Sequence, residues 1–315
     1  MNDLWMIGAG PMARDYAKVL QGQGRTCVVI GRGEESARAF AQHTGIEAHP
    51  GGLAAALGRS SAPREAIVTV GVEQLAPAAE ALIGAGTRRI LLEKPGGLHL
   101  GELQSLAAKA RATGVEVWIA YNRRFYASVR KAREWIEADG GVVSCFFEFS
   151  ELSHRIAPLQ KAAGVKEHWV LGNSSHVIDL AFWLCGRPSQ WSVWQDGSLP
   201  WHPAAARFAG SGITERGSLF SYLAEWEGPG RWGLELNTRE RRLFLRPMEQ
   251  LQQMQVRTVQ IEPVELEDAL DQQYKPGLYA QVEAFLTGHG RENLCSLEDQ
   301  VTAVADYTRM AGYEA

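Results

Sequence analysis

An apolar run and a glycine-rich turn, LWMIGAGPMA at residues 4–13, stand near the start of the chain and decide the fold. A helical pattern, DYAKVLQGQG, follows the turn, and a second apolar run, TCVVI at residues 26–30, follows the helix. Strand, glycine turn, helix and strand form a βαβ unit, which is the building block of a doubly wound nucleotide-binding domain. The stretch therefore predicts a dinucleotide site at the start of the helix.

The residues of this turn have separate physical roles. Gly8 permits the tight turn, Gly10 lets a pyrophosphate approach the backbone, and the small Ala13 allows the helix to pack closely on the strand. Together with Pro11 and Met12, they are our candidates for the cofactor-binding turn. The alternative is an ordinary glycine turn that holds no ligand.

The end of the second strand indicates which dinucleotide is bound. A carboxylate there would accept hydrogen bonds from the ribose 2′-hydroxyl and repel a 2′-phosphate. The chain instead reads VVIGRGEES, with Gly31 near the carboxylate position and Arg32 after it. A guanidinium pairs bidentately with phosphate, so these two residues favour NADP(H) over NAD(H). Two alternatives stay open: Glu34 or Glu35 contacts the ribose of NAD(H), or Arg32 is a solvated loop residue.

Helical and strand patterns continue to alternate after this point. Helices are predicted over 35–43, 75–85 and 101–112, and strands over 66–70, 88–93 and 115–121. This alternation predicts a parallel sheet with helices on both faces. Ligands of such sheets lie beyond the carboxyl ends of the strands.

Three groups of residues follow strands of this sheet and are expected around the nicotinamide end of a dinucleotide. Val70, Gly71, Glu93 and Lys94 are the candidate cofactor contacts there. Tyr121, Asn122 and Arg123 are the candidate substrate contacts.

Lys94 stands between a buried strand and a proline, in LLEKPGG at residues 91–97. Pro95 disfavours helical geometry at Lys94, so the lysine should stay extended at the strand end. A fixed cation beside a nicotinamide can hydrogen-bond the oxygen of an alcohol and stabilise the alkoxide charge that grows as hydride leaves. The alternative is a surface ion pair of Glu93 and Lys94, but the position in the sheet favours a catalytic lysine.

Composition narrows the classes of function. A chain of 315 residues is long enough for two domains, and a net charge of −4 provides no broad basic field for nucleic acid or an anionic membrane. The sequence shows neither a long apolar span nor a signal-peptide pattern, so we expect a cytoplasmic protein. The four cysteines form no CxxC pair, and no metal site is predicted.

The rest of the chain follows a different pattern. An amphipathic helix is predicted over 126–138, followed by a strand, GVVSCFFEFS, with Cys145, Phe147 and Phe149 on one face. Later apolar runs at 189–195, 217–226, 231–238, 241–247 and 251–261 are joined by short links and indicate an antiparallel meander. We therefore predict a dinucleotide-binding domain over 1–121 and an α+β domain over 122–315.

Five motifs occur in order along the chain: GAGPMA at 8–13, EKP at 93–95, YNRRF at 121–125, NSSHVIDL at 173–180 and SLEDQVTAVADY at 296–307. This combination resembles the glucose-fructose oxidoreductase / inositol dehydrogenase / rhizopine catabolism (Gfo/Idh/MocA) family. The resemblance implies a Rossmann domain followed by an open-faced, mostly antiparallel sheet that often forms a homodimer or homotetramer contact. It also implies a pyridine-nucleotide oxidoreductase of a sugar, nucleotide-sugar or cyclitol, with Lys94 near both ring and substrate.

His176 is the second candidate catalytic residue. On the apolar helix predicted over 173–184 it would by itself be interpreted as a core histidine. The resemblance instead implies an acid/base or substrate-orienting group, with Asn173 as a substrate contact. Members of the family commonly carry an aspartate where this chain has Gly172. A proton relay here must therefore run through Lys94, His176, water or another residue such as His168, while Asp179 anchors the helix or orients His176.

The leading hypothesis is a reversible alcohol-to-ketone hydride transfer, with Lys94 and His176 flanking the reacting carbon. One alternative keeps the cofactor bound and uses transient oxidation, as an epimerase, lyase or glycosidase does. Another is a non-catalytic nucleotide-sensing protein. Reduction of an imine or a double bond is a further alternative, because Lys94 can protonate those substrates too.

Overall fold

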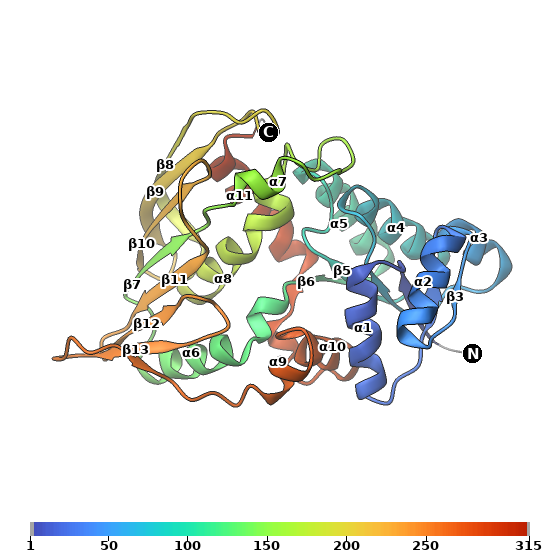
Figure 1. Cartoon of the computed structure of the whole chain (residues 1–315), viewed down its shortest axis with the longest axis horizontal. Helices are drawn as coiled ribbons and strands as arrows, with labels where there is room; N and C mark the ends of the chain where they lie inside the picture. The colour runs from blue at the N-terminus through green and yellow to red at the C-terminus, as the bar shows by residue number, and fades with distance from the viewer. Residues whose placement is uncertain (1–2, 314–315) are drawn as a thin grey trace. The chain divides into compact units, whose positions relative to one another are not determined.

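The computed structural model describes residues 3–313, which form two compact units (Figure 1). The first unit comprises the chain up to Asn122 together with Leu270–Thr302, and the second comprises Arg123–Ala269 and the chain from Ala303. The structure thus differs from the expectation of one continuous second domain over 122–315, because residues 270–302 return to the first unit.

Two contacts explain this return. The short strand β15 (Cys295–Ser296) pairs antiparallel with β6 (Glu116–Ala120), and helix α10 (Leu278–Thr287) packs on α1 (Pro11–Gly22). A strand of two residues has no periodicity, so the sequence contained no signal for this pairing.

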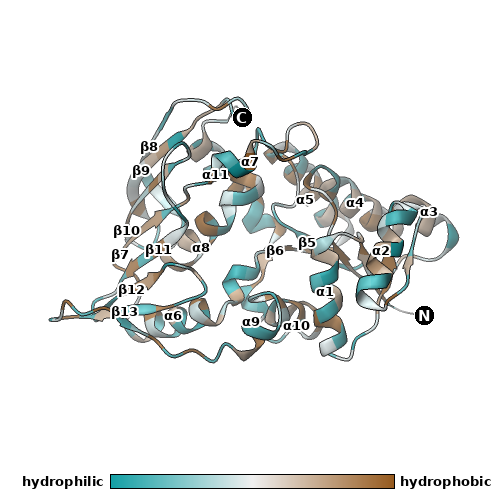
Figure 2. Cartoon of the chain, viewed as in Figure 1, coloured by the Kyte–Doolittle hydropathy of each residue, from teal (hydrophilic) through white to brown (hydrophobic). Residues whose placement is uncertain are grey.

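The first unit is built on a seven-stranded sheet with the order β15-β6-β5-β4-β1-β2-β3. Its remaining strands are β1 (Leu4–Ile7), β2 (Val28–Ile30), β3 (Ala48–His49), β4 (Glu65–Val68) and β5 (Arg89–Glu93). All neighbouring strands pair in parallel except β15. The predicted doubly wound Rossmann sheet is confirmed, and its strands are hydrophobic along most of their length (Figure 2).

Helices cover this sheet, with α1, α2 and α10 packed together and α3, α4 and α5 packed together (Figure 1). The other helices of this unit are α2 (Glu34–Thr44), α3 (Gly52–Arg59), α4 (Val72–Ala85), α5 (Leu100–Thr113) and the turn Arg291–Asn293. The turn Asn122–Phe125 and helix α9 (Ala269–Gln273) lie where the chain passes from one unit to the other. Helix α11 (Leu297–Ala311) begins in this unit and continues into the second. The sequence did not predict β3 or α3, because both are short and have no clear apolar period.

The second unit is built on an eight-stranded sheet with the order β14-β13-β12-β11-β7-β10-β9-β8. Its strands are β7 (Ser144–Glu148), β8 (Pro188–Asp196), β9 (Arg207–Thr214), β10 (Leu219–Glu225), β11 (Gly233–Asn237), β12 (Arg241–Leu245), β13 (Gln252–Gln255) and β14 (Glu262–Pro263). Its helices are α6 (Ala127–Ala138), α7 (Ser153–Ile156) and α8 (Ser175–Cys185), the last preceded by a wide turn at Val170–Ser174.

The predicted mostly antiparallel sheet is confirmed, but the meander is not continuous. Strand β7 lies between β10 and β11, pairing in parallel with β10 and antiparallel with β11. Two separate meanders, β8-β9-β10 and β11-β12-β13-β14, therefore flank β7.

Strand β9 was missed for a physical reason. Glycines normally weaken a strand interior, and β9 contains Gly210 and Gly212. A Cβ at Gly212 would lie 2.4 Å from Cβ of Trp191, and a Cβ at Gly210 would overlap the ring of Tyr222. At Gly210 the ring of Tyr222 occupies the space above the strand, and at Gly212 the backbone of the neighbouring strand β8 does.

One face of this sheet is the core of the second unit. Cys145, Phe147 and Phe149, which were predicted to share one face, are all buried, and the ring of Phe147 meets that of Phe182 on α8 edge-on at 5.5 Å. Leu219 and Leu223 on β10 are exposed on the opposite side. The sheet is therefore open-faced, as the family resemblance implied.

Candidate nucleotide-binding and catalytic site

The glycine turn joins β1 to α1, and its geometry fits a pyrophosphate. Gly8 has φ of +121°, and a Cβ there would lie 2.5 Å from Oγ1 of Thr69. A Cβ on Gly10 would meet nothing within 4 Å, so the space in front of this glycine is open to a ligand. Gly10 also caps α1 without a side-chain hydrogen bond, and the first turn of α1 holds no acidic residue. The backbone amides at this end can therefore receive an anion.

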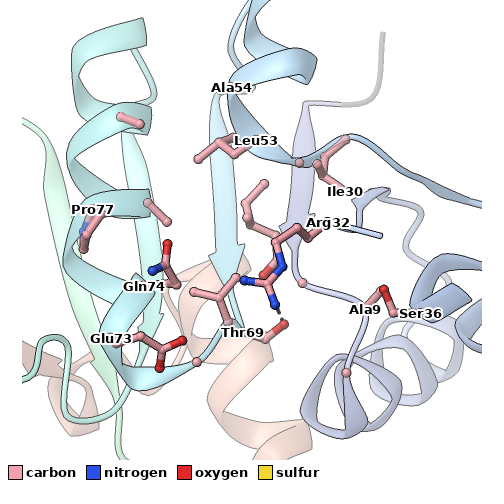
Figure 3. A pocket seen from close by; sticks show the side chains of 18 residues that line it. Ala9, Ile30, Arg32, Ser36, Leu53, Ala54, Thr69, Glu73, Gln74 and Pro77 are labelled. Atoms are coloured by element: carbon pink, nitrogen blue, oxygen red, sulfur yellow. Dashed lines mark hydrogen bonds between the residues drawn. The ribbon is translucent and has the colours of Figure 1, made fainter. Parts of the chain in front are cut away.

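A cavity of about 550 Å³ opens beside this turn (Figure 3). It lies at the carboxyl ends of β1, β2 and β4, where Ile7, Ile30 and Thr69 contribute to its wall. Five predicted cofactor residues line it: Gly8, Gly10, Arg32, Val70 and Gly71. Its volume and its place at the strand ends are those expected of a small-molecule site in a doubly wound fold.

The other predicted residues of the turn lie outside this wall. Ala13 is fully buried, which agrees with its expected role in packing α1 on the sheet. Pro11 begins α1, and the sulfur of Met12 contacts Lys275. Gly31 is buried, and a Cβ there would lie 3.3 Å from Cβ of Ala9.

Arg32 extends into the cavity from the end of β2, opposite Glu73 and Gln74 on α4 (Figure 3). Ser36, in the first turn of α2, lines the same wall. Glu34 and Glu35 are exposed and are not among the lining residues. Their carboxylates lie in the first turn of α2, where they interact favourably with the partial positive charge at the start of the helix.

Sequence reasoning missed Ser36, Thr69, Glu73 and Gln74 as lining residues. The carboxylate of Glu73 folds back toward Gly71, since a Cβ there would lie 2.6 Å from its Oε2. Thr69 Oγ1 donates to the carbonyl of Ile7 at 3.1 Å and ties the ends of β4 and β1 together. The available signal was position: Thr69 directly follows β4, and the other three residues lie in the first turn of a helix that follows a strand.

The end of β5 holds Lys94 between two anchored neighbours. Glu93 accepts a hydrogen bond from the buried hydroxyl of Tyr16 at 2.7 Å. The carbonyl of Pro95 accepts one from Nε2 of Gln300 at 2.8 Å, and the Lys94–Pro95 peptide is cis. Lys94 itself is half-buried. The backbone on both sides of the ammonium-bearing residue is therefore fixed.

The titration of Glu93 is shifted by its surroundings. Burial raises the pKa of the Glu93 carboxyl, and the Tyr16 hydrogen bond and the charges of Lys94 and Lys275 oppose that rise only in part. Burial, followed by the charge of Glu93, also raises the pKa of Tyr16. A proton is therefore held more tightly at this pair than on an exposed carboxylate.

Tyr121 and Asn122 have structural partners in the first unit. Tyr121 is buried, and its hydroxyl accepts a hydrogen bond from Nε2 of Gln300 at 3.1 Å. Nδ2 of Asn122 donates to the carbonyl of Pro276 at 2.9 Å. These contacts hold residues 270–302 against the sheet and occupy groups that the sequence assigned to substrate.

In the second unit, Arg123 and His176 come together around one tryptophan. The guanidinium of Arg123 lies 5.0 Å from the centre of the Trp232 ring, and the imidazole of His176 lies 6.1 Å from it. Burial lowers the pKa of the Arg123 guanidinium. Sequence reasoning did not single out Trp232, which it placed within the apolar run predicted over 231–238.

Asn173 contacts a buried carboxylate that the sequence did not single out. Its Nδ2 donates to Oε1 of Glu151 at 2.9 Å, and Oγ of Ser174 donates to the same oxygen at 2.7 Å. Glu151 thus accepts from two side chains that shortly precede His176 in the sequence. Gly172, in the same turn, has open space around its Cβ position.

Asp179 anchors α8, as one of the two sequence interpretations held. Its carboxylate accepts two hydrogen bonds from the buried Arg124, at 2.8 Å from Nε and 2.6 Å from Nη2. This bidentate pair ties the turn after β6 to α8.

No cluster of three or more metal-binding side chains occurs among residues 3–313. Across the same described range, every helix is too short or too polar to cross a bilayer.

The parallel sheet, the glycine turn and the cavity at the strand ends define a Rossmann-type nucleotide-binding protein. Residues 3–121 match the family model described as "Oxidoreductase family, NAD-binding Rossmann fold" (GFO_IDH_MocA). Over these residues the chain matches the Gfo/Idh/MocA family of NAD-binding oxidoreductases, which confirms the family that the motifs indicated.

Solved structures share the fold over the whole chain. A UDP-N-acetylglucosamine 3-dehydrogenase from Acidithiobacillus ferrooxidans has 17% identity and a TM-score of 0.76, covering 99% of this chain and 97% of that one. A putative NADPH-dependent oxidoreductase from Desulfitobacterium hafniense has 18% identity and a TM-score of 0.79, covering 98% of this chain and 94% of that one. A levoglucosan dehydrogenase in complex with NADH has 16% identity and a TM-score of 0.80, covering 98% of this chain and 96% of that one. No curated protein matches by sequence. At these identities the likeness shows the fold alone.

Proposed function

We propose that this protein is an NADP(H)-preferring oxidoreductase that transfers a hydride between nicotinamide and an alcohol or ketone of a carbohydrate-like substrate. The cavity at the strand ends carries this proposal, because it combines the open space at Gly10 with the uncapped start of α1. A side chain on Gly10 would fill space that a pyrophosphate needs.

The preference for NADP(H) is supported by the wall that Arg32 and Ser36 share. A guanidinium and a hydroxyl suit a 2′-phosphate, whereas Glu34 and Glu35, the alternative ribose contacts, are absent from that wall. The similar structures include a putative NADPH-dependent oxidoreductase and a dehydrogenase bound to NADH, so the fold is compatible with either preference.

The substrate class is supported by the names of similar proteins, which include a UDP-N-acetylglucosamine 3-dehydrogenase and a levoglucosan dehydrogenase. We propose a sugar, nucleotide-sugar or cyclitol. We also propose a homodimer or homotetramer through the open face of the second sheet, where Trp194, Leu219 and Leu223 are exposed.

A bound nicotinamide would supply or accept the hydride. The ammonium of Lys94 then donates a hydrogen bond to the reacting oxygen and stabilises its growing charge. Tyr16 and Gln300 hold the residues on either side of it. His176, beside Arg123 and Trp232, exchanges or orients the hydroxyl proton.

Turnover measurements test this assignment. Purified protein is assayed with NADPH or NADP⁺ and a panel of sugars, nucleotide-sugars and cyclitols, following the absorbance of the reduced nicotinamide. Lys94→Met should lower kcat by about 100-fold or more while the Kd for the cofactor stays within a few-fold. Lys109→Met, on the exposed face of α5, is the matched control. Unchanged kcat in Lys94→Met would remove this lysine from the mechanism.

A further inference from the structure

The segment that returns to the first unit lies along α1. The ammonium of Lys18 contacts the carbonyl of Gln273 and lies 5.4 Å from the centre of the Tyr274 ring. Nε2 of Gln23 donates to the carbonyl of Tyr279 at 3.0 Å. Residues 273–279 are therefore held against this helix at several points.

Lys275 sits in this docked segment with both neighbours fixed. Tyr274 packs near Lys18, and the carbonyl of Pro276 accepts a hydrogen bond from Asn122 at 2.9 Å. The Lys275 ammonium lies at the first turns of α1, 2.9 Å from Sδ of Met12 and 3.3 Å from Oδ2 of Asp15. The backbone thus directs a cation to the end of the helix that follows the glycine turn.

An anion bound at this position would be stabilised by the positive charge of Lys275 and of the helix start. The amino end of a helix carries partial positive charge, so an ammonium is unfavourable there by itself. A thioether sulfur is a weak acceptor, and Asp15 is a partly exposed carboxylate that offers limited compensation. The Lys275 charge also acts on Glu93, so it lies within electrostatic reach of the end of β5 as well.

We propose that Lys275 is a phosphate-binding residue of the nucleotide site, pairing with the pyrophosphate of the bound dinucleotide at the start of α1. The inference rests on the proposed function, because it needs a dinucleotide at the glycine turn. It adds a contact from a part of the chain that lies outside the glycine motif and outside residues 3–121, which the family model matches.

Binding measurements on four proteins test it: wild type, Lys275→Met, Lys275→Arg and Lys18→Met. In Lys275→Met the Kd for NADPH and the Kd for NADH should rise by a similar factor, about tenfold, because both dinucleotides share the pyrophosphate. The Kd for adenosine, which has no phosphate, should not change. Lys275→Arg keeps the charge and should bind dinucleotides nearly as wild type does.

Lys18→Met is the matched control, because it removes a contact to the same docked segment and leaves Lys275 in place. It should leave dinucleotide affinity close to that of wild type. The dependence of dinucleotide affinity on salt should be weaker in Lys275→Met than in wild type.

Two results would overturn the inference while leaving the proposed function intact. Wild-type dinucleotide affinity in Lys275→Met, with a lowered Tm, would show a structural ion pair with Asp15 only. An equal loss of adenosine affinity would show that the change acts on the shape of the site. If wild-type protein bound neither dinucleotide, the proposed function would fail, and this inference with it.

Discussion

The hydroxyl of Tyr16 donates a hydrogen bond of 2.7 Å to Oε1 of Glu93, directly before the lysine at the end of β5. This contact joins α1, which starts at the glycine turn, to the strand that carries Lys94. It therefore couples the two parts of the first unit that the proposed reaction needs.

The raised pKa of Glu93 predicts a pH-dependent stability difference. The folded state binds the proton more tightly than the unfolded state, so the stabilising contribution is full below the ordinary value of 4.5 and is lost as pH rises through the raised pKa. Glu93→Gln cannot ionise, so its Tm should improve relative to wild type as pH rises from about 4 to 8. Thermal unfolding across this range measures the difference, with Glu34→Gln on the exposed start of α2 as control. A constant difference between Glu93→Gln and wild type would contradict the assignment.

The two glycines of the turn should respond differently to alanine. Gly10→Ala places its Cβ in open space, so the free protein should keep its stability within about 0.5 kcal/mol. Its dinucleotide affinity should fall about tenfold or more, because that space is where the pyrophosphate binds. Gly8→Ala should destabilise the free protein by about 1–3 kcal/mol, since its φ is +121° and its Cβ would crowd Thr69. Unfolding and nucleotide titration of both variants provide the comparison. Undiminished affinity in Gly10→Ala would place the pyrophosphate elsewhere.

Arg32 should discriminate between the two dinucleotides. Arg32→Ala removes a cation from the wall of the cavity, so the Kd for NADPH should rise about tenfold while that for NADH stays nearly constant. Arg38→Ala, exposed on α2 and outside the wall, is the control. An equal loss for both dinucleotides in Arg32→Ala would show that this arginine does not bind the 2′-phosphate.

The buried Arg124–Asp179 pair should contribute much more to the unfolding free energy than an exposed ion pair does. Asp179→Asn leaves the buried guanidinium without a counter-charge and should cost about 3–5 kcal/mol of unfolding free energy. Glu137→Gln makes the same chemical change in the exposed pair with Arg133 and should cost about 0.5 kcal/mol or less. Urea denaturation distinguishes the two. Similar small losses in both variants would mean that the buried pair is no more important than the surface one.

The sequence was sufficient to predict the elements that have a clear hydrophobic period or follow a glycine turn. The βαβ start, the alternation through residue 120 and the inward face of Cys145, Phe147 and Phe149 follow from local patterning. Strand β9 could not be predicted in this way, because Gly210 and Gly212 interrupt its alternating pattern. The reason for these glycines is the close approach of Tyr222 and Trp191, which only the tertiary structure shows.

The candidate site was predictable where a motif lies on adjacent residues and not where distant segments meet. Gly8, Gly10 and Arg32 line the cavity as their positions indicated. The partners of Tyr121 and Asn122 are Gln300 and Pro276, from a segment that only the tertiary structure brings back to the first unit. The same return places Lys275 at α1, which no local pattern could show.

Titration of the purified, cofactor-stripped protein with NADPH and with NADH, followed by intrinsic fluorescence, tests the central claim most directly. The account predicts saturable binding of both, with a Kd for NADPH about tenfold lower than for NADH, as expected for one additional phosphate contact. Equal or tighter binding of NADH would contradict the NADP(H) preference and move the ribose contact to Glu34 or Glu35. Absence of binding for either dinucleotide at sub-millimolar concentration would contradict the oxidoreductase mechanism assigned to Lys94.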